Sequence, residues 1–224
     1  MPLFNPPSSS GIKNYLLNSN FDFWQRSTSP TAANGATLYT ADRWYIKNSL
    51  GTNGILGFSR STGTAGVSKY ALNVLVSTAP TAAQVNGCEL YQVLENLASQ
   101  ELYNKNASFS IKVKAQANVT QVGIQFFYAT SEVKLTTAIG SEVLTTVNSS
   151  TFTDCIINGQ ALGTSMTVDG VVGVRIRPTA VSSGNLYDIN NGFSVQQSML
   201  NVGNVVAAWQ RAEPSMGVEF LACQ

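Results

Sequence analysis

Residues Ser108–Ala115 read Ser-Phe-Ser-Ile-Lys-Val-Lys-Ala, the most regular alternation of apolar and polar residues in the chain. Phe109, Ile111, Val113 and Ala115 occupy every second position, with serine and lysine between them. Successive side chains of a β-strand point to opposite faces. This stretch therefore predicts a strand with one buried face and one solvated face.

Two other stretches show the same period of two. One is Val122–Tyr128 and the other is Val172–Ile176, in which valine and isoleucine alternate with glycine and arginine. Pro178 follows the second stretch and is expected to end it, because proline has no N–H to donate to a neighbouring strand.

Weaker alternation predicts eight further strands, and only Glu95–Tyr103 has a helix-like composition. The weaker strands are Arg43–Lys47, Gly54–Arg60, Ala71–Ser77, Leu90–Leu94, Val143–Val147, Cys155–Ile157, Phe193–Met199 and Val205–Trp209. Many short strands with almost no helix between them predict an all-β fold, an antiparallel β-sandwich of jelly-roll type. The expected core comprises Phe21, Phe23, Trp44, Phe109, Ile111, Val113, Ile124, Phe126, Val174 and Ile176.

The chain has 224 residues, of which 44% are hydrophobic, and this suits one sandwich spanning residues 14–224. Residues 1–13 hold three prolines and three consecutive serines, so this segment is expected to be an extended N-terminal arm. Leu3 and Phe4 are its apolar anchors, which we expect to dock on another subunit. A frayed terminus is the alternative.

The composition argues against several classes of partner. Charged residues make up 11% of the chain, below the roughly 25% of an ordinary soluble domain, so the polar surface must consist largely of uncharged side chains. The net charge is +1 and the basic residues are scattered, which argues against nucleic acid. No apolar run approaches the roughly 20 residues of a membrane span, and no secretory signal is expected.

The residues of most enzyme classes are missing from the sequence. The chain has no histidine, and its 12 acidic residues stand singly. A glycosidase that needs only two carboxylates is the enzymatic alternative, because residues distant in sequence can meet in the fold. Cys88, Cys155 and Cys223 are odd in number and far apart, which predicts buried free thiols. We expect no catalytic residues, no cofactor and no metal.

Two segments near the N-terminus form a distinctive pair. Residues 18–26 read Asn-Ser-Asn-Phe-Asp-Phe-Trp-Gln-Arg, and residues 39–44 read Tyr-Thr-Ala-Asp-Arg-Trp. This pairing resembles a family of bacteriophage tail-fibre and virion-surface proteins with a jelly-roll fold like that of carbohydrate-binding modules. Looser similarities are at Gln92–Leu94, at Lys105–Ala115 and at Glu219–Gln224, which looks like the closing strand of the family. The family's Gln-Leu-Glu-x-Gly turn is reduced here to Gln-Ser-Met at residues 197–199.

The paired motifs are interpreted as scaffold. Phe21 and Phe23 are expected on one face of a strand, covered by Trp44. Arg26 and Asp42 are expected to form a charge-assisted hydrogen bond that fixes the connecting loop.

The alternative for the aromatic residues of these motifs is a glycan platform. Trp24 and Tyr45, or Trp44, could stack on a sugar ring instead of packing in the scaffold.

The resemblance implies a non-enzymatic structural protein of a tailed-phage virion, assembled in the host cytoplasm. The sequence favours an accessory surface protein of cement or decoration type, which docks on capsid or tail subunits through its arm. The alternative is a tail-fibre receptor-binding module that recognises a glycan of the host surface. The resemblance also implies a homo-oligomer, and trimers are common among the proteins that this chain resembles.

Overall fold

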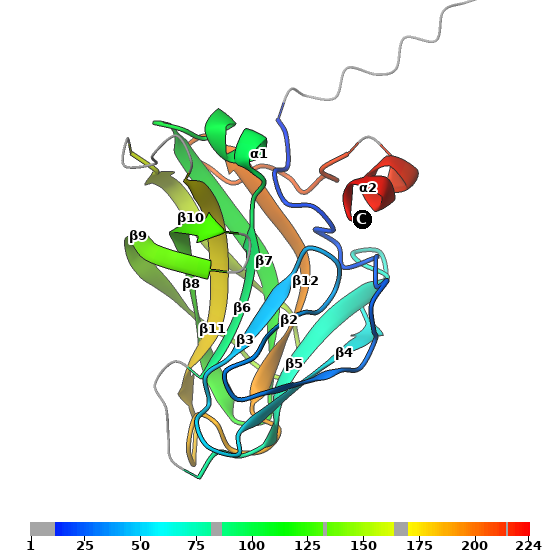
Figure 1. Ribbon diagram of the computed structural model, residues 1–224, viewed down its shortest axis with the longest axis vertical. Helices are drawn as coiled ribbons and strands as arrows, with labels where there is room; N and C mark the ends of the chain where they lie inside the picture. The colour runs from blue at the N-terminus through cyan, green and yellow to red at the C-terminus, as the bar shows by residue number, and fades with distance from the viewer. Residues whose placement is uncertain (1–11, 82–86, 132–133, 164–169, 214) are drawn as a thin grey trace, which may run out of the picture.

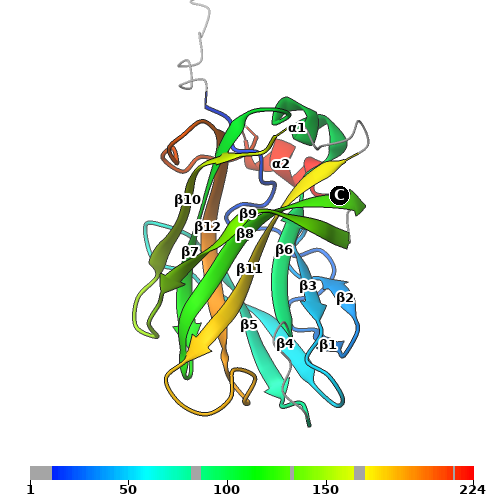
Figure 2. The ribbon, with the colours of Figure 1, turned by 90° about the vertical axis from the view of Figure 1, so that its left-hand side faces the viewer.

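The computed structural model describes residues 12–81, 87–131, 134–163, 170–213 and 215–224. Two six-stranded sheets pack face to face, and every strand pairing that the structure describes is antiparallel (Figures 1 and 2). The first sheet has the order β1 (Thr31–Ala33), β4 (Ile55–Thr62), β5 (Tyr70–Thr78), β12 (Gly192–Val202), β7 (Asn106–Gln116) and β10 (Thr153–Ala161).

The second sheet lies in front in Figure 2. Its order is β2 (Thr37–Tyr39), β3 (Tyr45–Asn48), β6 (Cys88–Val93), β11 (Val171–Val181), β8 (Val119–Ser131) and β9 (Lys134–Thr146). Two short helices, α1 (Asn96–Glu101) and α2 (Met216–Ala222), lie at one end of the sandwich (Figure 1). The predicted fold class, an antiparallel β-sandwich, is confirmed.

The core lies between the two sheets and contains nine of the ten residues expected there, and the tenth, Phe23, is buried outside this cluster. The rings of Phe109 on β7 and Phe126 on β8 meet edge to face, with their centroids 6.2 Å apart. Because β7 and β8 belong to different sheets, this contact joins the two layers. The three cysteines are buried free thiols, as predicted.

The expectation that Pro178 ends its strand is wrong, because β11 continues to Val181. On one side β11 pairs with β6 over Gly173–Ile176, and Pro178 lies beyond that pairing. On its other side Pro178 lies opposite Val122 of β8, and the register shifts directly afterwards. Proline is tolerated where a strand has lost one neighbour or at a bulge, and both conditions hold here.

The C-terminal segment predicted as a closing strand is helix α2 instead. Ser215 begins the helix with a hydroxyl that accepts a hydrogen bond from the backbone N–H of Val218. The side chains of Glu219 and Cys223, one helical turn apart, are both buried. The apolar side chains of Met216, Val218, Phe220 and Leu221 are exposed, so burial in this segment follows the helical turn and not the alternation of a strand.

Residues 205–209, predicted as a strand, have no strand partner. Asparagine side chains bind the backbone of this segment instead: Asn158 accepts from the N–H of Val206, and Asn201 accepts from the N–H of Ala207. The short strands β1 and β2 were not predicted, because three residues show no period. The segment around Phe21 is a turn and not a strand, with Phe21 itself at a φ of 57°.

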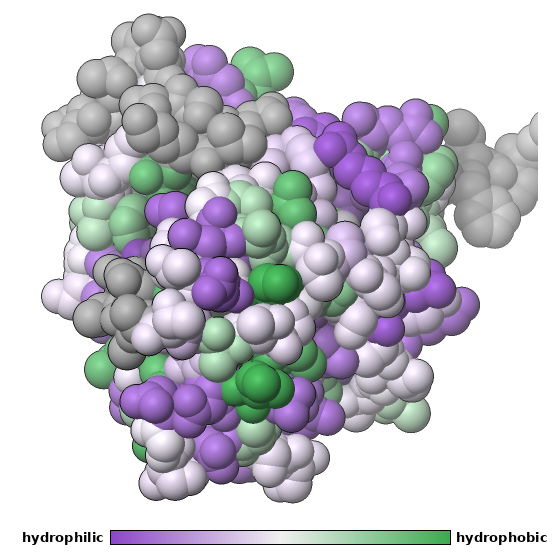
Figure 3. All heavy atoms as spheres, turned by 60° about the horizontal axis from the view of Figure 1, so that its bottom comes forward, coloured by the Kyte–Doolittle hydropathy of each residue, from purple (hydrophilic) through white to green (hydrophobic). Residues whose placement is uncertain are grey.

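The arm anchors Leu3 and Phe4 lie outside the described residues, so their docking stays a prediction. No described helix is long and apolar enough to span a membrane. On the face drawn in Figure 3, hydrophilic and intermediate residues predominate and apolar residues appear as small separate areas. This face agrees with the surface of mainly polar residues expected from the composition.

Candidate functional site

The outward face of the second sheet contains a cavity of about 340 Å³. Core residues such as Ile46, Leu90 and Val174 point to the opposite face of the same strands. Strand register places the lining residues side by side: Lys47 lies opposite Glu89 and also opposite Thr37. The lining residues are Thr37, Lys47, Glu89, Tyr91, Phe127, Leu135 and Arg175.

Three tyrosines form a stack beside this cavity. Tyr45 lies between Tyr39 and Tyr91, with ring centroids 4.1 Å and 5.4 Å away, and the Tyr45–Tyr91 pair is nearly parallel. The Arg26 guanidinium lies 3.7 Å from the centroid of the Tyr39 ring. Burial raises the pKa of Tyr91 to about 12, and a hydrogen bond with Thr37 partly offsets this rise. The tyrosine faces are therefore occupied by each other and by a guanidinium.

A chain of five charged side chains crosses the same face. Lys47 pairs with Glu89 at 3.4 Å and Arg175 pairs with Glu89 at 2.8 Å. Arg175 also reaches Glu142 at 3.1 Å, and Arg177 pairs with Glu142 at 2.7 Å. The Arg175 guanidinium lies 4.4 Å from the centroid of the Phe127 ring. We call this chain, from Lys47 through Glu89, Arg175 and Glu142 to Arg177, the charge ladder.

The charge ladder keeps the carboxyl group of Glu142 ionised. Burial on its own raises the pKa of Glu142, but the hydrogen bonds and positive charges of Arg177 and Arg175 outweigh burial and lower that pKa below its usual value. A glycosidase needs one carboxyl group with a raised pKa as its general acid. The pKa of Glu142 is lowered instead, so Glu142 is poorly suited to act as a general acid.

Gly123 makes room for the charge ladder. A Cβ at this position would lie 2.5 Å from the Cδ atom of Glu142, so any side chain would displace that carboxyl group. We expect Gly123→Ala to cost about 1–3 kcal/mol in the free energy of unfolding, because it separates a partly buried carboxylate from Arg177. Urea denaturation measures this cost.

A strand glycine with more room provides the control for Gly123→Ala. A Cβ at Gly57 on β4 would have its nearest neighbour 3.5 Å away, an ordinary contact, so Gly57→Ala should be near neutral. In a Glu142→Ala background the cost of Gly123→Ala should largely disappear. An equal cost in both backgrounds would show that Gly123 is needed for the backbone and not for Glu142.

Comparison with known proteins gives information on the fold. No family model matches the chain, and no curated protein matches it in sequence. A candidate sugar-binding protein of Bacteroides thetaiotaomicron superposes with a TM-score of 0.53 at 13% identity, over 85% of this chain and all of the other. A xylan-binding domain of carbohydrate-binding module family 22 gives 0.50 at 13% identity, over 87% and 98% of the two chains.

A family 4 module gives 0.50 at 10% identity, over 83% of this chain and 97% of the other. The fold is a carbohydrate-binding-module-like β-sandwich. Because these identities are low, the likeness applies to the fold alone. The resemblance to bacteriophage proteins rests on the sequence motifs, chiefly those at residues 18–26 and 39–44.

The aromatic residues considered as a glycan platform are mostly enclosed. Trp44 is fully buried with its ring 5.1 Å from that of Phe21, and Tyr45 is 4% exposed within the tyrosine stack. Trp24 is half-buried, packs against the core and donates its indole N–H to the backbone oxygen of Phe21 at 2.7 Å. Phe23 packs against Phe220 of α2. The scaffold interpretation thus describes their packing, and neither Trp44 nor Tyr45 offers a ring face to a sugar.

The predicted pairing of Arg26 with Asp42 is replaced by other contacts. Both carboxylate oxygens of Asp42 accept from the backbone N–H of Gln25 at 3.2 Å, while Arg26 stacks on Tyr39. Burial raises the pKa of Asp42, and the Gln25 contact and the charges of Arg26 and Arg43 partly offset that rise. The loop is therefore fixed by a backbone hydrogen bond to Asp42, and Arg26 acts only as a nearby charge.

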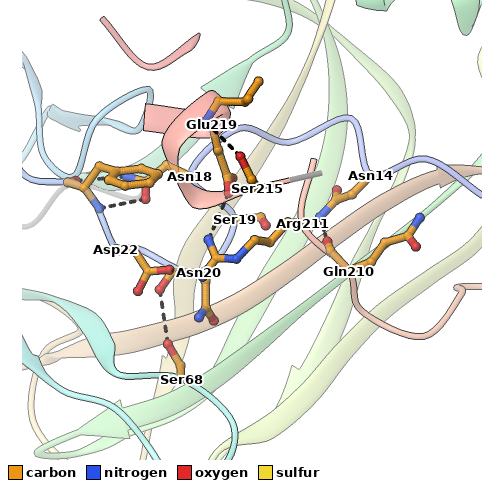
Figure 4. Close-up of polar contacts among 12 residues, drawn as sticks. Asn14, Asn18, Ser19, Asn20, Asp22, Ser68, Gln210, Arg211, Ser215 and Glu219 are labelled. Atoms are coloured by element: carbon orange, nitrogen blue, oxygen red, sulfur yellow. Dashed lines mark hydrogen bonds and ion pairs between the residues drawn. The ribbon is translucent and has the colours of Figure 1, made fainter. Parts of the chain in front are cut away.

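A second polar cluster joins the N-terminal motif to α2 (Figure 4). Arg211 binds Asp22 at 2.7 Å and Glu219 at 2.9 Å. Asn14 donates to the backbone oxygens of Ser198 and Gln210. The contacts of Asp22 and Asn14 join segments about 190 residues apart, and they explain why the motif region is well packed without being a strand.

A second cavity, of about 300 Å³, lies between the segment following the arm, α1 and the C-terminal region. Four of its five charged lining residues form ion pairs: Lys13 with Glu101 at 3.1 Å, and Arg43 with Glu95 at 2.9 Å. Arg43 also donates to the backbone oxygen of Ala222. We regard the cavity beside the charge ladder as the better candidate site, because its most exposed charged group, Lys47, is only loosely paired.

Proposed function

We propose that this protein is a non-enzymatic glycan-binding module whose site is the cavity on the outward face of the second sheet. The observation that carries the proposal is the cavity itself, about 340 Å³ in size and formed by register-matched side chains of several strands. This volume falls within the roughly 300–1,000 Å³ of small-molecule sites. The fold neighbours described as sugar-binding and xylan-binding support the proposal.

The lining of the cavity suits a sugar. Beside Phe127, whose ring is covered by Arg175, Leu135 provides an apolar contact for the C–H surfaces of a pyranose ring. The hydroxyl of Thr37, the ammonium group of Lys47 and the carboxylate of Glu89 provide hydrogen-bonding groups for its hydroxyls. An apolar wall with a few converging polar groups is the usual composition of a small-ligand site.

The motif resemblance extends this proposal to a phage virion. The protein would then be a receptor-binding module, and its ligand would be a glycan of the host surface. The accessory role of cement or decoration type is the second candidate. The low charge content of the chain favours that role, which would act through Leu3 and Phe4.

Filling the cavity tests the proposed site. In Thr37→Trp the indole ring would occupy the cavity, so we expect the affinity for a bound glycan to fall at least tenfold. Leu38→Trp is the matched control, because Leu38 is exposed on the opposite face of the same strand β2. Binding to an array of bacterial surface glycans, followed by calorimetry on the hits, measures the effect.

The outcome that would contradict the proposed site is equal binding by both variants. A wild-type protein that binds no glycan on the array would contradict the proposed function itself. Thermal unfolding of the two variants shows whether a loss of binding reflects a loss of folding.

A further inference from the structure

We infer that the cavity selects anionic sugars and that Lys47 binds their acidic group. This inference rests on the proposed function and adds the chemical class of the ligand. Its first support is the balance of charge: among the described side chains of the ladder, three cations, Lys47, Arg175 and Arg177, face the two carboxylates of Glu89 and Glu142. One positive charge is therefore in excess.

The excess positive charge is accessible at Lys47. Its side chain is 50% exposed, whereas those of Glu89, Arg175, Glu142 and Arg177 are 9–17% exposed. Glu89 is bound at 2.8 Å by Arg175 and only at 3.4 Å by Lys47. Since Glu89 is already neutralised by the closer arginine, the Lys47 ammonium group can turn to a ligand without leaving a buried carboxylate unpaired.

The neighbours of Lys47 favour an anion further. Thr37 lies directly opposite Lys47 in the strand register, and both line the cavity. Its hydroxyl can donate a hydrogen bond to the same acidic group. An ion pair in a partly enclosed site is screened less by salt than one at an open surface.

The cavity has no open aromatic face on which a neutral sugar could stack. Tyr91 is 1% exposed and lies against Tyr45, and Phe127 is covered by the guanidinium of Arg175. Polar and charged contacts must then decide which sugar binds. Of these, the surplus cation distinguishes most strongly between ligands, because it contributes to the binding of an acidic sugar and not of its neutral analogue.

The test compares acidic oligosaccharides with their carboxyl-reduced counterparts on the full-length chain. The probes are oligogalacturonate, oligoalginate and oligosialate, each with its reduced form, and a sulfated oligosaccharide separates carboxylate from sulfate recognition. We expect at least one acidic probe to bind about tenfold more tightly than its reduced form. That difference should shrink as the salt concentration rises.

Variants of Lys47 assign the preference to this residue. Lys47→Gln should lower the affinity for the acidic probe about tenfold more than the affinity for the reduced probe, because glutamine keeps a hydrogen-bonding group and loses the charge, while Lys47→Arg should keep most of the preference. Lys69→Gln removes the same charge from the exposed loop between β4 and β5 and should change neither affinity.

The outcomes separate this inference from the proposed function. Equal binding of acidic and reduced probes, or a preference that persists in Lys47→Gln, overturns the inference and leaves glycan binding in place. Binding of neutral glycans alone also overturns the inference and leaves glycan binding in place. Binding of no probe and no array glycan overturns both.

Discussion

Replacing Phe109 with alanine is expected to lower the free energy of unfolding by about 3–5 kcal/mol. The ring is fully buried on β7 and meets Phe126 of β8 edge to face, so its removal leaves a cavity between the two sheets. Strands on both sides hold the backbone in register, because β7 pairs with β10 and β12. The surrounding structure can therefore collapse only partly into the space. Urea denaturation measures the loss.

The control for Phe109→Ala is Leu144→Ala, at a strand position in β9 that is 53% exposed, where we expect a change within about 0.5 kcal/mol. A double-mutant cycle with Phe126→Ala should show coupling of about 0.5–1.5 kcal/mol. A near-neutral Phe109→Ala would mean that the two sheets do not meet through these rings.

The second large effect is expected from Arg211→Met, with a loss of about 3–4 kcal/mol. The variant keeps an unbranched apolar stem but leaves the carboxylates of Asp22 and Glu219 without their arginine. The side chains of these two acids are 7% and 1% exposed, so neither can be solvated in place. Most of the loss is therefore the cost of orphaned charge. Adding Glu219→Gln to Arg211→Met should recover part of it.

The same variant should respond to pH in a defined direction. Burial raises the pKa of Glu219 in the folded protein, and Arg211 partly offsets this rise. Between the unfolded and folded pKa values the native state binds more protons, so this carboxyl group makes the protein less stable as pH rises. Without Arg211 the folded pKa of Glu219 rises further, so the pH range over which this group destabilises the protein extends upward. The deficit of Arg211→Met relative to the wild type should be smaller at pH 5 than at pH 7.5, and an unchanged deficit would contradict the assignment to Glu219.

The prediction of strands from local periodicity failed at three places where contacts outside the alternating pattern decide the structure. The segment 205–209 has apolar residues like a strand, but Asn158 and Asn201 bind its N–H groups. Pro178 continues a strand because β6 does not pair with β11 beyond Ile176. Glu219 was read as part of a closing strand, yet it lies on a helix directed at Arg211. In each case the deciding contact, or the end of a strand pairing, is not visible in the periodicity of the segment itself.

The sequence by itself determined the all-β class, the main strands and the seven expected core residues on β7, β8 and β11, because alternation along one strand fixes which face is buried. The candidate site could not be predicted in this way. Lys47, Glu89, Glu142 and Arg175 come from β3, β6, β9 and β11, and no motif in the sequence connects them. Only the register between strands joins them into one ladder beside a cavity, and register depends on the packing of the whole sandwich.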